Sequence, residues 1–121
     1  MRIIKMEFTK TVQISGDKDK YTISPEIKKY ALLDLGFEQT NRGNFEYLGS
    51  LDTDNPFKPV ARLRILINND LDGFKMETIS GNGLRKINIF NHQRAAEFIQ
   101  QYHYILDEMV ALQIKKKKKL C

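Results

Sequence analysis

The sequence predicts an α+β fold in which antiparallel β-strands are covered by one long C-terminal helix. Apolar and polar residues alternate in several short segments, glycine- or asparagine-containing turns separate them, and a three-four apolar spacing appears near the end of the chain. Parallel strands would need crossover helices, which this pattern does not supply. For 121 residues we expect a single domain over residues 1–114, followed by a disordered basic tail over residues 115–121.

The first expected elements form a hairpin. Apolar side chains occupy alternate positions from residue 6 to residue 14, except at Lys10, which predicts a half-buried strand. A turn over residues 15–19 leads to a short partner strand at 21–23. An N-cap residue followed by proline, Ser24-Pro25, then predicts one or two helical turns through residue 30.

The stretch from residue 27 to residue 38 has two interpretations. It could be one helix that Gly36 ends, or residues 33–38 could form a strand that pairs with residues 45–51 across a turn at 41–44. We favour the hairpin. Residues 52–59 contain two prolines and predict the longest surface loop.

A three-stranded meander and a helix complete the expected fold. The strands cover residues 60–68, 74–80 and 84–90, and residues 81–83 form a tight turn. Asn91 is expected to cap a helix that runs to about Ile114. Its broad apolar stripe is suited to covering a sheet.

The net charge of +5 is concentrated in one place. Without the five consecutive lysines, the chain has 15 basic and 15 acidic residues, so we expect no nucleic acid to bind the body. The lysines could make weak contacts with RNA phosphates, although a solubilising tail is the favoured interpretation. These tail residues are Lys115, Lys116, Lys117, Lys118 and Lys119.

The expected strand registers separate the charges of the body onto two faces. The outward row of the meander carries Arg62, Arg64, Lys75 and Lys86 against Glu77 alone. This row is a candidate binding face for an acidic partner or for another copy of the chain in a homo-oligomer. The simpler interpretation is a solvated face with cross-strand ion pairs. Three carboxylates mark the opposite, acidic face: Asp34, Glu38 and Glu46.

The residues predict no catalytic centre, metal or cofactor. Asp52-Thr53-Asp54 lacks the later ligands of a calcium loop and is interpreted as a pair of polar turn caps. His92 and His103 would lie about 16 Å apart along one helix, so they cannot share an ion. The single cysteine, Cys121, has no expected partner base. With no apolar run near the roughly 20 residues of a membrane span, we expect a cytoplasmic protein.

Several short motifs, taken in order, resemble those of a known family from lactic-acid bacteria and their relatives, domain-of-unknown-function family eighteen thirty-one. The likeness covers roughly Met6 to Leu112 and implies two β-sheets packed on a single helix, with no established catalytic residues. The motifs are Phe8-Thr9-Lys10-Thr11-Val12 with Gly16-Asp17, Ser24-Pro25-Glu26-Ile27-Lys28-Lys29-Tyr30, Gly43-Asn44-Phe45, Leu51-Asp52 with Asn55-Pro56-Phe57, Gly73-Phe74-Lys75-Met76, Asn82-Gly83-Leu84-Arg85 and Asn88-Ile89-Phe90.

The resemblance also implies a functional context. Members of the family are sometimes labelled cysteine desulfurase, but such an enzyme binds pyridoxal phosphate in a far larger fold and needs a positioned cysteine. A remote likeness to S-adenosylmethionine decarboxylases supplies no activity, because no serine here follows a glutamate. We expect a non-catalytic accessory or binding protein linked to sulfur or amino-acid metabolism, with a protein of sulfur transfer or tRNA thiolation as partner. The alternatives are a binder, or minor enzyme, of an adenosyl or amino-acid compound between the sheets, and weak RNA binding through the tail.

Overall fold

A four-stranded sheet and a three-stranded sheet share one long helix, as a computed structural model of residues 8–14, 16–17, 20–23, 27–55, 57–109 and 114–117 shows. The larger sheet has the order β3-β4-β5-β6 and the smaller one β1-β2-β7, all antiparallel. The predicted α+β class with two antiparallel sheets and a long C-terminal helix is therefore confirmed. The elements are β1 (Thr11–Val12), β2 (Lys20–Ile23), α1 (Lys29–Asp34), β3 (Glu38–Gln39), β4 (Phe45–Ser50), β5 (Ala61–Ile67), β6 (Phe74–Ser80), the 3₁₀-helix η1 (Ile89–Asn91), α2 (Ala95–Met109) and β7 (Ile114–Lys117).

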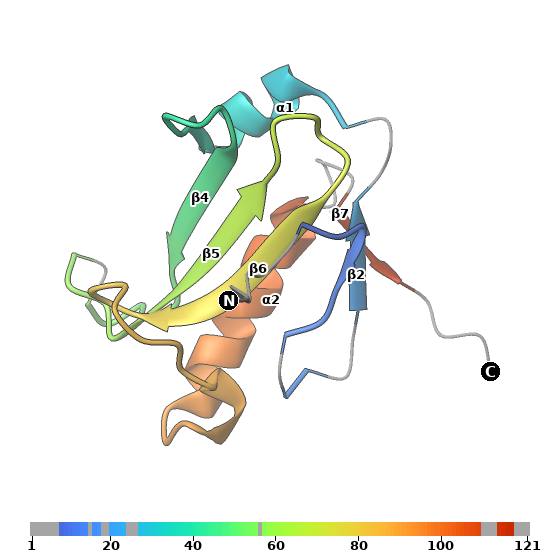
Figure 1. Cartoon of the computed structure of the whole chain (residues 1–121). Coiled ribbons are helices and arrows are strands. Elements are labelled where there is room, and N and C mark those ends of the chain that lie inside the picture. The colour runs from blue at the N-terminus through green and yellow to red at the C-terminus, as the bar shows by residue number, and fades with distance from the viewer. Residues whose placement is uncertain are drawn as a thin grey trace, which may run out of the picture.

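The core lies between the sheets and α2. Alternate residues of β5 point inward, and all four are completely buried. Figure 1 shows α2 crossing one face of β5 and β6, with β2 and β7 beside it. Helix and strands thus exclude water from both sides of one apolar layer. The α2 side chains that fill this layer are Phe98, Tyr102, Ile105, Leu106 and Met109.

The first strand is shorter than the alternation predicted. Only Thr11 and Val12 pair with β2, while Thr9 forms a separate antiparallel bridge with Phe74 of β6. This bridge connects the two sheets, with Thr9 N to Phe74 O at 3.1 Å and Phe74 N to Thr9 O at 2.8 Å. Met6, where the strand was expected to begin, lies outside the described residues.

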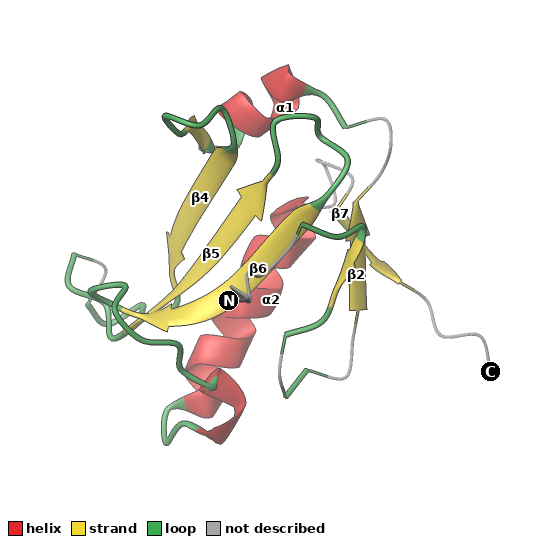
Figure 2. Ribbon diagram, viewed as in Figure 1, coloured by secondary structure: helices red, strands yellow, loops and turns green. Residues whose placement is uncertain are grey.

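The interpretation of residues 27–38 needs correction. Residues 29–34 form α1, and Gly36, at φ +101°, ends it, while the N–H of Phe37 donates to the carbonyl of Leu32 at 3.0 Å. Glycine tolerates this left-handed conformation, which suits a helix C-terminus. The expected hairpin does form, but its first strand is only β3 (Figure 2).

The segment 84–90 does not form the expected strand. It makes a single bridge, between Lys86 and Ile79, before the chain turns into η1. The turn arises because the side-chain oxygen of Asn88 accepts a hydrogen bond from the N–H of Phe90 at 2.9 Å. The long helix then begins at Ala95, and His92 Nδ1 accepts from the N–H of Arg94 at 3.0 Å in place of a cap at Asn91.

The chain forms a strand, β7, where we expected the end of the helix and the start of a disordered tail. Residues 114–117 pair with β2 in antiparallel register, with Ile114 opposite Ile23 and Lys117 opposite Lys20. This corrects the expectation of disorder for Lys115, Lys116 and Lys117. Lysine is common on edge strands, because its backbone can join the ladder while its charge opposes further strand addition. Lys118 and Lys119 lie outside the described residues.

No helix within the described part of the chain is long and apolar enough to span a membrane.

Candidate functional site

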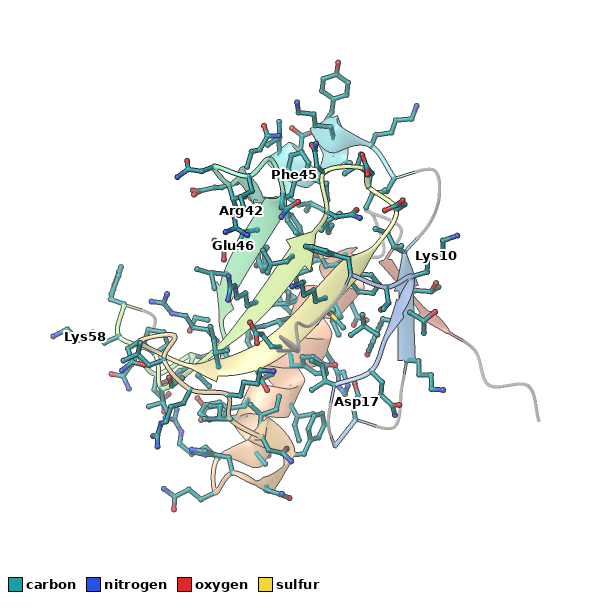
Figure 3. The ribbon with its side chains drawn as sticks, in the orientation of Figure 1. Lys10, Asp17, Arg42, Phe45, Glu46 and Lys58 are labelled. Carbon is teal, nitrogen blue, oxygen red and sulfur yellow. The ribbon has the colours of Figure 1, made fainter. Side chains whose placement is uncertain are left out.

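A pocket of about 400 Å³ opens where the loop after β4 meets the turn after β6. The loop contributes residues 57–59 and the turn region contributes Ser80, Gly81, Asn82 and Arg85, with Arg62 of β5 between them. Figure 3 shows Lys58 beyond one end of β4, while Arg42 lies near the other end.

Asp52 holds the loop in place from inside the protein. Its carboxylate is completely buried and accepts from the backbone N–H groups of Asp54, Asn55 and Val60 at 3.1, 3.2 and 3.0 Å. These bonds confirm that Asp52 is a turn cap. They connect the start of the loop to its end, so residues 57–59 form a short loop whose two ends are held together.

Arg94, which precedes α2, neutralises this buried carboxylate. Its Nη2 and Nη1 atoms donate to the two oxygens of Asp52 at 2.7 and 3.3 Å. Hydrogen bonding to the guanidinium holds the pKa of Asp52 well below its usual range, although burial acts in the opposite direction. The same bonds, with a second pair to Glu97, raise the pKa of Arg94. Sequence reasoning missed Arg94, because the pair joins residues 42 positions apart.

The acidic cluster around Arg94 is better explained by this arginine than by a metal ion. Carboxylate oxygens of Asp52, Asp54 and Glu97 lie within 4.8 Å of one another, an arrangement that a cation could bridge. Arg94 Nη2 already lies 2.7, 3.3 and 2.6 Å from these three groups. The guanidinium therefore supplies the positive charge, and the cluster holds the loop after β4 against the start of α2.

The opposite wall of the pocket depends on Gly81. Its N–H donates to the carbonyl of Val60 at 3.0 Å, and a Cβ atom there would lie 1.7 Å from the carbonyl oxygen of Pro59. No side chain fits this approach. Ser80 and Asn82 hold the turn through a 2.7 Å side-chain hydrogen bond, and Ser80 also accepts from the N–H of Arg85 at 3.2 Å. The two walls are thus preorganised.

The described charged residues that line the pocket are all positive. Lys58, Arg62 and Arg85 line it, and none of them takes part in an ion pair with another described residue. Its described lining contains no carboxylate. Three cations around one small volume without a counter-charge create a positive potential that attracts anions.

The structure divides the predicted basic row instead of presenting it as one face. Arg62 lines the pocket, whereas Arg64 lies between Glu46 and Glu77, with N···O distances of 2.8 and 3.1 Å. The predicted separation into a basic and an acidic face is wrong, because β4 and β5 are neighbours in one sheet and bring Glu46 beside Arg64. The cross-strand ion pairs weighed as the simpler interpretation are present.

The other two residues of the row have different surroundings. Lys75 Nζ lies 4.6 Å from the ring centroid of Phe8, a cation–π contact. Lys86 Nζ lies 3.9 Å from a Glu77 oxygen. The cations that line the pocket together with Arg62 are Lys58 and Arg85, which the sequence analysis did not propose as binding residues. Local pattern could not have found them, since a loop and a turn bring them together.

A second pocket, of about 410 Å³, lies between the two sheets. Gln13 and Ile14 form one side and residues 76–78 of β6 with residues 86–88 form the other. Its polar groups are largely engaged, since Gln13 donates to the Asp17 carbonyl at 2.7 Å and Thr78 donates to the Ile87 carbonyl. It therefore offers fewer free groups to a ligand than the cationic pocket does.

Comparison with known proteins identifies relatives of the whole domain. The model of the family DUF1831, described as "Putative amino acid metabolism", matches residues 6–116. The crystal structure of a DUF1831 family protein from Lactobacillus plantarum is similar with a TM-score of 0.84 and 39% sequence identity, covering 93% of this chain and 100% of that chain. No curated protein matches the sequence.

Proposed function

Because the chain belongs to the DUF1831 family, we propose that it is a cytoplasmic, non-catalytic binding protein of amino-acid metabolism whose cationic pocket holds a small anionic molecule. The family description supports the metabolic context. The observation that carries the binding role is the set of three cations, Lys58, Arg62 and Arg85, that line one pocket without an ion pair among the described residues.

The chemistry of the lining supports binding over catalysis. Among the described residues it consists of cations, an amide, a hydroxyl and apolar groups, with no histidine, thiol or carboxylate to transfer a proton near neutral pH. Arginine forks match the oxygens of carboxylates and phosphates in pairs of parallel hydrogen bonds. A volume of about 400 Å³ lies within the range of small-molecule sites.

Titration with inorganic phosphate, followed by amide chemical shifts at constant ionic strength, tests the proposal. Shifts should concentrate in residues 57–62 and 80–85, and Arg62→Gln should weaken binding about tenfold, the effect of one lost charge-assisted contact. Arg42→Gln is the matched control, because it removes the same charge at the far end of β4 (Figure 3). Equal weakening by both variants would mean that only net charge matters, and would refute the pocket.

A protein partner is the second candidate, favoured by apolar side chains beside the pocket. Phe57 and Leu84 are 94% and 80% exposed. Large exposed apolar groups next to cations suit an acidic segment with an apolar anchor, which a protein of sulfur transfer or tRNA thiolation would have to present. Pull-down with the wild-type chain and with a Phe57→Ser/Leu84→Ser variant tests this, since equal recovery of such a protein would reject the surface.

A further inference from the structure

We infer that the ligand of the cationic pocket is a small phosphate monoester in which the organic group attached to the phosphate is flat and apolar. The phosphate would lie among Lys58, Arg62 and Arg85, and the apolar group would pack on the ring of Phe57. This ligand class rests on the proposed function, since it assumes that the pocket binds an anion.

The charge of the pocket favours phosphate over a single carboxylate. A phosphate monoester carries about 1.5 to 2 negative charges at neutral pH and presents three terminal oxygens. Three cations that form no ion pair with a described residue can meet three oxygens, while a carboxylate offers one charge and two oxygens. Two of the cations are arginines, whose planar forks fit phosphate oxygens bidentately.

The pocket has room for more than the phosphate. Its volume of about 400 Å³ is many times the roughly 30 Å³ that one water occupies in the liquid. An inorganic phosphate would leave most of this space to solvent. A ligand with a body beyond its phosphate would fill the space and reach the loop wall.

Phe57 indicates what that body is. Phe57 lines the pocket yet is 94% exposed, so it contributes almost nothing to the core. The loop that carries it is fastened by the buried Asp52 through Val60 on one side and Asp54 on the other. A solvent-facing ring on a loop that is held at both ends offers a surface for stacking a flat group, which typically strengthens binding by a few-fold to about tenfold.

Calorimetric titration with phenyl phosphate, inorganic phosphate and benzoate tests the inference. Phenyl phosphate should bind about tenfold more tightly than inorganic phosphate, and benzoate should bind most weakly. Phe57→Ala should reduce phenyl phosphate to the affinity of inorganic phosphate and leave inorganic phosphate unchanged. Tyr30→Ala, at another highly exposed aromatic residue in α1, is the matched control and should change neither.

The pH dependence gives an independent readout. Lowering the pH from about 7.5 to about 5.5 should weaken phenyl phosphate about fourfold, because the second ionisation of a phosphate monoester lies near pH 6. Benzoate, which keeps its charge over this range, should show no such loss.

The outcomes separate the inference from the proposed function. If both phosphates bind equally and Phe57→Ala has no effect, the flat apolar group is refuted and the anion pocket stands. If benzoate binds as tightly as phenyl phosphate, the phosphate preference is refuted. If none of the three anions binds, or if Arg62→Gln and Arg42→Gln weaken them equally, the proposed function fails and the ligand class fails with it.

Discussion

Replacing Asp52 with asparagine tests the fastening on which the pocket depends. The carboxylate accepts five hydrogen bonds, three from backbone N–H groups and two from Arg94. An asparagine oxygen in the position of Oδ1 keeps three of them and loses the bonds from Val60 and from Arg94 Nη1. The side-chain NH₂ group of the asparagine, itself a donor, would then face two other donors, the N–H of Val60 and Nη1 of Arg94. At about 1 to 1.5 kcal/mol for each of the two lost bonds, Asp52→Asn should reduce the free energy of unfolding by about 2 to 3 kcal/mol.

Urea denaturation at pH 7 measures this change, with an unchanged m-value as the sign that the fold is preserved. Asp54→Asn is the matched control, because Asp54 is 73% exposed and makes one 3.3 Å contact with Arg94. It should cost less than about 0.5 kcal/mol. A cost below about 1 kcal/mol for Asp52→Asn would refute the reasoning that this carboxylate holds the loop.

The pH dependence of stability in the wild type and in Asp52→Asn tests the ion pair between Asp52 and Arg94. The pKa of Asp52 is lowered in the folded state, while the unfolded value is about 3.9. Its stabilisation is therefore complete above the unfolded pKa and is lost as the pH falls through the folded pKa. The difference between wild type and Asp52→Asn should shrink as the pH falls from about 5 toward 2, and a constant difference would contradict the ionic pair.

Three further substitutions test the packing. Gly81→Ala should destabilise the protein by about 2 kcal/mol or more and abolish phosphate binding, because its Cβ would overlap the Pro59 carbonyl. The control Gly83→Ala lies in open space at φ +77° and should cost about 1 kcal/mol, with urea denaturation as the measurement for both. Phe98→Ala should cost about 3 to 5 kcal/mol as a core cavity, against less than about 0.5 kcal/mol for the exposed Tyr104→Ala in thermal unfolding. Tyr102→Phe should cost about 1 to 2 kcal/mol by removing the 2.6 Å hydrogen bond to Asp17.

Strong periodicity made the central elements predictable. β5, β6 and α2 bury one face each along most of their length, so the spacing of their apolar residues reports their structure directly. The short elements were less predictable. Gly36 decides where α1 ends, Asn88 turns the expected last strand into η1, and the ladder with β2 draws residues 114–117 into a strand. Each outcome depends on a single cap or a distant partner, which outweighs local propensity.

Composition and hydrophobic spacing alone determined the class of the fold, the single long helix and the turn-capping role of Asp52, because each follows from neighbours a few residues apart. Only the tertiary structure decided which cations pair with a described carboxylate and which line the pocket. Arg62 and Arg64 are two residues apart on one strand, yet β4 and β6 supply carboxylates to Arg64, while loop 57–59 and turn 80–85 place Arg62 among other cations. Electrostatic pairing depends on distances in space, and those are set by contacts between segments far apart in the chain.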